Sequence, residues 1–188
     1  FLLHLLRHGE AEGAGTLTGH RDAAPLPEGV AACLARGLDL PVQRIVSSDL
    51  QRARRPAEAV GAARGLPHRV DPRWRELDFG DWEGRDPATI PADAIGAFWT
   101  DPDAAPPPGG ESWSALCARI GAALEEIDGP TLVITHAGAI RAALHHLLGF
   151  DHRQGWAVAL PHAALVTLRV WPGEARSAQL VALLGDSP

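Results

Sequence analysis

Two kinds of apolar pattern alternate along the chain. Short, nearly continuous apolar runs predict buried strands over residues 1–6, 42–46, 66–70 and 130–135. Apolar residues spaced three or four positions apart predict a helix from residue 27 to near 37–41, and further helices over residues 49–64, 111–128 and 137–148. This alternation predicts an α/β fold, a three-layer α/β/α sandwich with a mostly parallel central sheet.

Local signals refine one of these helices and add further strands. Ser47 or Ser48 is expected to cap the helix over 49–64, and Pro56 is expected to kink that helix or to mark a restart. The helix over 137–148 is stopped by Gly149. The apolar residues beyond it predict strands over residues 157–160, 164–171 and 179–183.

A long irregular segment, residues 71–112, is rich in Trp, Pro and Gly. It exceeds an ordinary connection, so we expect a lid or binding loop with one short helix within residues 87–99. No linker divides the chain, and we expect a single domain over residues 1–188 with 80–112 as an inserted cap. Four aromatic side chains of this region either stack on a planar part of a ligand or form the cap's own small core: Trp82, Phe98, Trp99 and Trp113.

Composition and charge exclude several classes of protein. The 188 residues carry a net charge of −6, which argues against a general binder of nucleic acid or of anionic membranes. No apolar run approaches the roughly 20 residues that span a bilayer, and the apolar opening lacks the basic region and cleavage site of a signal peptide. Cys33 and Cys117 are isolated, as expected for reduced core thiols of a cytoplasmic protein. The sequence leaves monomer and homodimer as alternatives.

Two histidines stand just past predicted buried strands, His8 after residues 1–6 and His136 after residues 130–135. Neighbouring strand ends converge on the ligand crevice of an open α/β sheet, so we expect both imidazoles to meet around one oxyanion. A neutral imidazole can act as a nucleophile when its other nitrogen donates to a fixed acceptor, often a backbone carbonyl. The simpler alternative is a satisfied histidine at a strand end, with Arg7 in a salt bridge.

Two arginines can complete an anion site around these histidines. The planar fork of Arg7 matches phosphate oxygens. Arg52 lies one turn into the helix after Ser47-Ser48, where backbone amides and the helix dipole favour an anion. Together with His136, which can carry positive charge in a transition state, they would form a cationic cradle. Arg54 and Arg55 are expected on a solvated helix face.

A candidate general acid lies in the stretch from residue 74 to 84. Glu76 is surrounded there by apolar and aromatic residues, and such a carboxyl can protonate a leaving alkoxide and then activate water. Asp78, Asp81 and Glu83 belong to the same stretch and are rival acids. Spacing alone does not choose among the four.

Metal binding is the main chemical alternative. The chain has nine histidines, but none forms an HExxH motif or a Cys/His zinc spacing. His145 and His146 are adjacent, so they face different directions on a helix. We therefore expect no metal ligands among them, nor at His152 or His162.

Five segments taken together resemble the histidine phosphatase superfamily, also called the phosphoglycerate mutase-like family. The resemblance runs along nearly the whole chain. Each segment by itself is only moderately specific, whereas all five in this order are very specific. They are residues 6–10, residues 19–22 with 25–26, residues 47–53, residues 76–84 and residues 135–138.

The resemblance implies roles that the residues alone left open. It implies that His8 accepts the phosphoryl group and that Glu76 is the proton donor. It also implies a mostly parallel sheet between helices, a cap over the site, and no metal or other cofactor. The residues implied to hold the phosphoryl group or to contact the substrate are Arg7, Arg52, His136, Gly19 and Ala137.

Within the family, residues 76–84 look like the small phosphatase branch. Residues 99–102 and 107–112 are similar to α-ribazole phosphatases, which act on α-ribazole 5′-phosphate or adenosylcobalamin 5′-phosphate. We expect a phosphomonoesterase for a small phosphorylated metabolite. The alternatives are a phosphoglycerate mutase, a broad-specificity sugar-phosphate phosphatase and a non-catalytic phospho-ligand module, which would have to lack His8 or Glu76.

The chain also departs from the family pattern at four positions. Ala11 stands where the family often has Thr, Ala14 where Asn is usual, and Ala137 where Gly is common. Pro56 replaces a usual Thr. A polar contact to phosphate is therefore lost, or is supplied by Thr16 or Thr18. We expect these changes to affect affinity and rate rather than the class of reaction.

Overall fold

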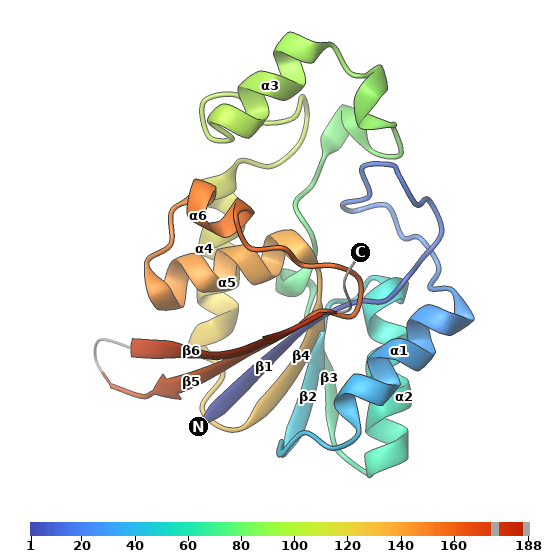
Figure 1. The fold of residues 1–188 in the computed structure, drawn as a ribbon, viewed down its shortest axis with the longest axis vertical. Coiled ribbons are helices and arrows are strands. Elements are labelled where there is room, and N and C mark those ends of the chain that lie inside the picture. Colours follow the sequence, from blue (N-terminus) through green and yellow to red (C-terminus); the bar gives the residue numbers. More distant parts are fainter. Residues whose placement is uncertain (174–176, 186–188) are drawn as a thin grey trace.

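The computed structural model of the protein describes residues 1–173 and 177–185, and within them six strands form one central sheet (Figure 1). The strand order is β3-β2-β4-β1-β5-β6. The first four strands are parallel, whereas β5 runs antiparallel to both of its neighbours. The strands are β1 (Leu2–Arg7), β2 (Arg44–Ser47), β3 (His68–Val70), β4 (Thr131–Thr135), β5 (Leu165–Trp171) and β6 (Ser177–Leu184).

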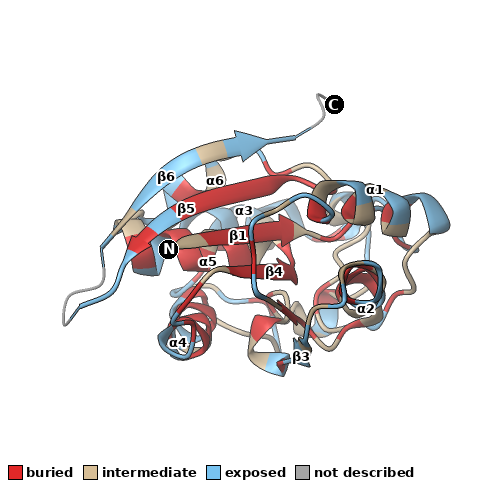
Figure 2. Cartoon of the chain, turned by 90° about the horizontal axis from the view of Figure 1, so that it is seen from below, coloured by how far each residue is buried: buried red, intermediate tan, exposed pale blue. Residues whose placement is uncertain are grey.

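Alternate side chains of each strand pack against helices on opposite faces of the sheet. On β4, Val133 belongs to the core formed with helices α4 and α5, whereas Leu132 and Ile134 belong to the core formed with α1 and α2. Figure 2 shows the buried strands β1 and β4 at the centre of these layers. The predicted three-layer fold is confirmed. The four helices are α1 (Pro27–Gly37), α2 (Gln51–Arg64), α4 (Trp113–Glu125) and α5 (Ala137–Leu148).

Three parallel strands end at the same edge of the sheet. Arg7 of β1 pairs in register with Thr135 of β4, and Ser47 of β2 with Ile134. The pairing extends beyond the strands, because the amide of His8 donates to the carbonyl oxygen of Thr135 over 2.8 Å. The segments after β1, β2 and β4 therefore start side by side, which is the convergence that the sequence predicted.

The start of α2 differs from the predicted cap. The helix begins at Gln51, and the Ser48 hydroxyl accepts from the Leu50 amide before the helix starts. The Gln51 amide instead donates to the carboxylate of Asp22, 2.7 Å away. The cap thus comes from another loop, which no local signal indicates. The helix continues through Pro56 without interruption.

The strand predicted over residues 157–160 is wrong. Residues 157–160 instead form a turn and irregular backbone after a short helix, α6 (His152–Trp156). Asp151 starts this helix with a capping box, in which its carboxylate accepts from the Gln154 amide and the Gln154 side chain accepts from the Asp151 amide. After the helix, the carbonyl oxygen of Val158 accepts from the Arg141 side chain rather than from a neighbouring strand. The other predicted strands and helices are present, with ends shifted by a few residues.

The segment from residue 71 to 112 contains one short α-helix and three 3-10 turns. The turns, Pro72–Trp74, Gly80–Trp82 and Pro87–Thr89, precede helix α3 (Ala92–Thr100), which confirms the short helix expected within 87–99 apart from a one-residue extension at its end. The helix begins after Pro91, whose extended backbone precedes the first turn of α3. In Figure 1, α3 lies at the end of the molecule farthest from the sheet.

Most aromatic side chains of this region are buried, but they join the larger core on the α4 and α5 face of the sheet. Trp82, Phe98 and Trp113 are 5 %, 1 % and 5 % exposed, and the Trp82 and Phe98 rings pack edge to face with centroids 5.7 Å apart. Trp99 is 43 % exposed and packs on Phe98 and on Trp156. The three buried rings are therefore core residues, as one of the two interpretations expected, but they do not form a separate small core of the cap.

The two cysteines behave as the sequence predicted. Cys33 and Cys117 are both buried and unpaired. Burial raises the pKa of each thiol to about 12, so both remain protonated and unreactive at neutral pH. No helix within residues 1–173 or 177–185 has the length and apolar character needed to span a membrane.

Candidate active site

The two sequence-predicted histidines meet at the ends of β1 and β4. The ring centroids of His8 and His136 are 5.2 Å apart, with the rings inclined at 62°. Their side chains are almost completely buried, at 7 % and 0 % exposure. The expectation that the two imidazoles come together at the strand ends is confirmed.

The His8 ring is held in one tautomer by the backbone. Its Nδ1 lies 2.7 Å from the carbonyl oxygen of Gly9, which can only accept, so Nδ1 carries the proton and Nε2 carries the lone pair. Burial, together with the positive charges of Arg52 and Arg7, holds the pKa of His8 well below its ordinary value. The ring is therefore neutral at pH 7, with a nucleophilic nitrogen free.

His136 is a buried imidazole without hydrogen-bond partners in the described part of the chain. Both of its ring nitrogens are buried and unsatisfied. Burial, Arg52 and His8 lower the pKa of His136 well below its ordinary value. Unpaired polar atoms at such depth are unfavourable unless a ligand bonds to them, so His136 indicates a polar ligand beside His8.

Arg52 projects from the first turn of α2 and is 1 % exposed. Its guanidinium donates to the carbonyl oxygens of Arg21 over 2.7 Å, Gly19 over 2.6 Å and Thr18 over 3.2 Å. Among the described residues its hydrogen-bond partners are carbonyls rather than carboxylates. The charge is stabilised by dipoles but is not neutralised, so it remains available to an anion.

Arg7 contributes a second buried guanidinium at the same edge. One of its terminal nitrogens donates to the carbonyl oxygen of Leu160. The Nε atoms of Arg7 and Arg52 are both buried and unsatisfied within the described residues. The two cations and the two neutral imidazoles form a site of net positive charge inside an acidic protein.

The geometry separates Glu76 from the rival acids. The Glu76 carboxylate lines the pocket and accepts from the amides of Leu77 and Gly138, over 2.8 and 3.1 Å. A methyl group on Gly138 would lie 2.0 Å from Glu76 Oε1, so only glycine leaves room for the carboxylate there. Asp78 faces His20, and Asp81 is exposed.

The backbone of Glu76 is held as firmly as its side chain. Its carbonyl oxygen accepts from Arg119 over 2.7 Å and from the His20 ring over 3.0 Å. Arg119 also donates to the carbonyl oxygens of Arg73 and Arg75 and pairs with Glu111. The segment that presents Glu76 is thus clamped to α4.

Glu83, the fourth rival, is a structural anchor. Its carboxylate accepts hydrogen bonds from four backbone amides, those of Gly19, His20, Arg21 and Phe79. The same loop directs its carbonyl oxygens at Arg52. Glu83 therefore fixes the loop that holds the buried guanidinium.

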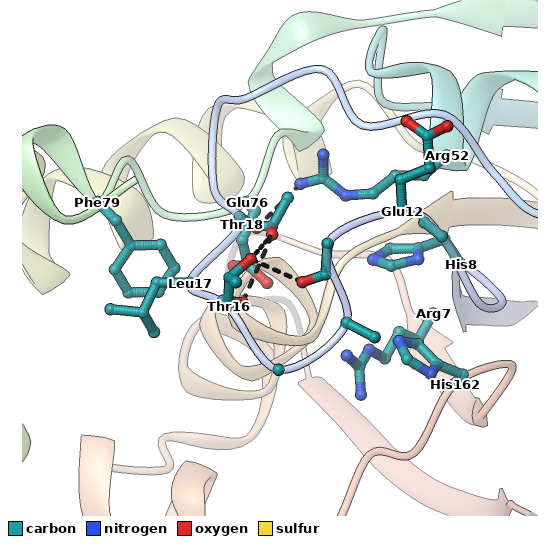
Figure 3. A pocket seen from close by; sticks show the side chains of 14 residues that line it. Arg7, His8, Glu12, Thr16, Leu17, Thr18, Arg52, Glu76, Phe79 and His162 are labelled. Atoms are coloured by element: carbon teal, nitrogen blue, oxygen red, sulfur yellow. Dashed lines mark hydrogen bonds between the residues drawn. The ribbon is translucent and has the colours of Figure 1, made fainter. Parts of the chain in front are cut away.

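A pocket of about 260 Å³ is lined by Arg7, His8, Arg52 and Glu76. Figure 3 shows Arg7, His8 and His162 on one side and Thr16, Thr18 and Glu76 toward the other. The loop from residue 11 to 18 forms much of its wall, and the hydroxyls of Thr16 and Thr18 lie within it, 3.2 Å apart. Sequence reasoning assigned no role to His162 or to Glu12, which also line it.

Three expected substrate contacts, His136, Gly19 and Ala137, are not among the residues that line this pocket. His136 lies next to it through His8, whose ring centroid is 5.2 Å away. The Gly19 amide donates to Glu83 and its carbonyl accepts from Arg52, so Gly19 acts on the site through these two residues. Ala137 opens α5 directly after His136.

Arg54 pairs with Glu58 and Arg55 is exposed, as expected for a solvated helix face. No cluster of three or more His, Cys, Asp or Glu side chains suited to a metal occurs among the described residues.

The family profile of the histidine phosphatase superfamily (branch 1) matches residues 3–182. The chain belongs to this superfamily. Its segments after β1, β2 and β4, which carry the site, all fall within the matched range.

Two relatives of this histidine phosphatase are named as phosphatases. It is 30 % identical over 167 residues to adenosylcobalamin/α-ribazole phosphatase of Salmonella typhimurium, covering 82 % of this chain and 83 % of the relative. It is 35 % identical over 167 residues to glucosyl-3-phosphoglycerate phosphatase of Mycobacterium tuberculosis, covering 78 % and 74 %. The solved structure of a mycobacterial glucosyl-3-phosphoglycerate phosphatase with VO3 aligns with a TM-score of 0.85 at 31 % identity, covering 96 % and 97 %.

Replacing the anchor Glu83→Ala should weaken both the fold and the anion site of this histidine phosphatase. Four backbone amides would lose their acceptor, and we expect the free energy of unfolding to fall by roughly 1–3 kcal/mol. Inorganic phosphate should also bind less tightly, because the loop that holds Arg52 loosens. Urea denaturation and titration calorimetry measure the two effects.

The matched control is Asp81→Ala, which removes an exposed carboxylate two residues away. It should leave stability and phosphate affinity near the wild-type values. An unchanged phosphate affinity in the Glu83 variant would show that this anchor does not support the site.

Proposed function

We propose that the protein is a metal-independent phosphomonoesterase in which His8 forms a phosphohistidine intermediate. The observation that carries this proposal is the His8 tautomer, with Nε2 unprotonated beside His136 and two buried guanidinium groups. A positive site around a neutral nucleophile suits an anionic electrophile such as a phosphate ester. The VO3 bound by the mycobacterial neighbour, an oxyanion, supports the same proposal.

In the first step, His8 Nε2 attacks phosphorus and a P–N bond forms while the bond to the ester oxygen breaks. Glu76 transfers its proton to the departing alkoxide, which leaves as an alcohol. Arg7, Arg52 and His136 face the non-bridging oxygens and stabilise their charge. Glu76 becomes a carboxylate, held by the Leu77 and Gly138 amides.

In the second step, water replaces the alcohol. The Glu76 carboxylate accepts a proton from the water as its oxygen attacks phosphorus, and the P–N bond breaks. Inorganic phosphate is released, His8 returns to its neutral form and Glu76 is protonated again. No metal or other cofactor enters either step.

We propose that the substrate is α-ribazole 5′-phosphate or adenosylcobalamin 5′-phosphate. We also propose that the protein acts in the cytoplasm. The resemblance of residues 99–102 and 107–112 and the relative in Salmonella typhimurium support this choice. The aromatic ring of Phe79 lines the pocket on the Glu76 side, where the leaving group would lie. Glucosyl-3-phosphoglycerate is the second candidate, because the mycobacterial relative shares more identical residues.

A panel of phosphate esters tests the substrate and the reaction class together. The panel holds α-ribazole 5′-phosphate, adenosylcobalamin 5′-phosphate, glucosyl-3-phosphoglycerate, 3-phosphoglycerate and simple sugar phosphates. We expect release of inorganic phosphate, with the highest kcat/KM on α-ribazole 5′-phosphate. A higher value on glucosyl-3-phosphoglycerate would reassign the substrate, and isomerisation of 3-phosphoglycerate without phosphate release would identify a mutase.

His8→Ala should abolish turnover while leaving the fold intact. Loss of a covalent nucleophile closes the two-step route and lowers kcat by several orders of magnitude. Rapid quenching during turnover should trap an acid-labile phosphohistidine in the wild type and none in the variant. His146→Ala, which changes a half-exposed imidazole paired with Glu125, is the control and should keep full activity. Full activity of the His8 variant would exclude the covalent mechanism.

Glu76→Gln should act mainly on esters with poor leaving groups. An amide cannot donate the proton that an alkoxide needs, so kcat for alkyl phosphates should fall by roughly 10²–10⁴-fold. Hydrolysis of p-nitrophenyl phosphate, whose leaving group needs little assistance, should fall far less. Asp78→Asn changes a rival carboxyl and should affect both esters equally. Equal losses for both esters in the Glu76 variant would count against Glu76 as the donor.

A further inference from the structure

His162 is the one pocket histidine that the proposed mechanism does not use. It stands in the turn before β5, and this turn is tied to the nucleophile: the Ala163 amide donates to the carbonyl oxygen of His8 over 3.1 Å. The Arg7 amide donates to the carbonyl oxygen of Ala164 over 2.9 Å. The backbone that carries His162 is therefore fixed against the backbone that carries His8.

The turn itself has a strained backbone next to His162. Ala163 has φ of 56°, the only positive φ of a non-glycine residue within the described ranges. Such a conformation is unfavourable for alanine and persists only where surrounding contacts determine it. The strain lies directly next to His162, at the point where the chain turns past the pocket.

The His162 ring flanks His8 on the side of Arg7. Its centroid is 5.6 Å from that of His8, similar to the 5.2 Å that separates His8 from His136. In Figure 3 it lies alongside Arg7, and across the pocket from Glu76. The ring therefore faces the side of the phosphoryl group away from the departing alcohol.

We propose that His162 is a further ligand of the phosphoryl group and donates a ring N–H to one of its non-bridging oxygens. This inference rests on the proposed function, since it names a contact of the same site. Two imidazoles then flank the nucleophile and the phosphoryl oxygens. His136 lies directly before α5, and His162 lies in the turn before β5. The His162 ring lines the pocket and makes no hydrogen bond to any described residue, so it is available to a ligand.

A contact of this kind makes anion binding depend on pH. The charged or titratable groups that face the ring are Arg7, His8 and Glu10. Burial and Arg7 lower the pKa of His162, while Glu10 opposes them, so the ring is neutral at pH 7 before a ligand binds. A bound phosphate dianion favours the imidazolium form, so the ring takes up a proton on binding and the His162 contact strengthens as the pH falls.

The test compares inorganic phosphate binding by the wild type, His162→Ala and His162→Gln with titration calorimetry from pH 6 to 8.5. The ratio of variant to wild-type Kd cancels the ionisation of phosphate itself. We expect a ratio of roughly tenfold for His162→Ala at pH 6 that shrinks as the pH rises. Glutamine keeps a donor but takes up no proton, so its ratio should be smaller and should also shrink with rising pH.

The controls separate this contact from a structural role and from the proposed function. His146→Ala should bind phosphate like the wild type at every pH, and Tm should be the same for all variants. KM should rise equally for p-nitrophenyl and alkyl phosphates, because the contact is to the transferred group. Phosphate binding is measured without turnover, so an inactive wild type would overturn the proposed function alone. A pH-independent ratio near one would overturn the role of His162.

Discussion

The structure depends on a buried positive charge whose hydrogen-bond partners, among the described residues, are carbonyl oxygens rather than carboxylates. Arg52 is almost completely enclosed, and the carbonyl oxygens of residues 18, 19 and 21 hold its guanidinium. The backbone amides of the same loop donate to the Glu83 carboxylate. One short loop therefore directs its carbonyl oxygens toward the Arg52 cation and its N–H groups toward the Glu83 anion. Dipoles stabilise the Arg52 charge without cancelling it. The charge therefore remains available to an anionic ligand.

The positive charges of the buried arginines also determine the protonation state of the histidines. Arg52 and Arg7 act with burial to lower the pKa of His8, which keeps the ring neutral, and the Gly9 carbonyl decides which nitrogen is free. His136 experiences the same charges, and both of its nitrogens lack partners among the described residues. A site that repels protons from its imidazoles and attracts anions suits nucleophilic attack on a phosphate ester. Glu76 lies at its other side, held by the Leu77 and Gly138 amides.

Much of this was predictable, because the site lies where apolar runs end. His8 and His136 follow buried strands, and parallel strands that end together must bring their following residues together. Glu83 was not predictable as an anchor, since it stands among other carboxyls and three of its four amide partners, those of residues 19–21, come from a loop about sixty residues earlier. Asp22 caps α2 in place of the local serines for the same reason. His162 had no signal at all, because its segment looked like a strand followed by a turn.

The amino-acid sequence by itself determined the alternation of strands and helices, the family, and the types of side chain available to the site. Hydrophobic periodicity and short motifs are local, so they can be recognised along the chain. Only the tertiary structure decided which carboxylate lines the pocket with His8, which one anchors a loop, and which of nine histidines flank one another. These outcomes depend on contacts between residues distant in the chain, and on burial, which sets charge and hydrogen bonding only once the layers have packed.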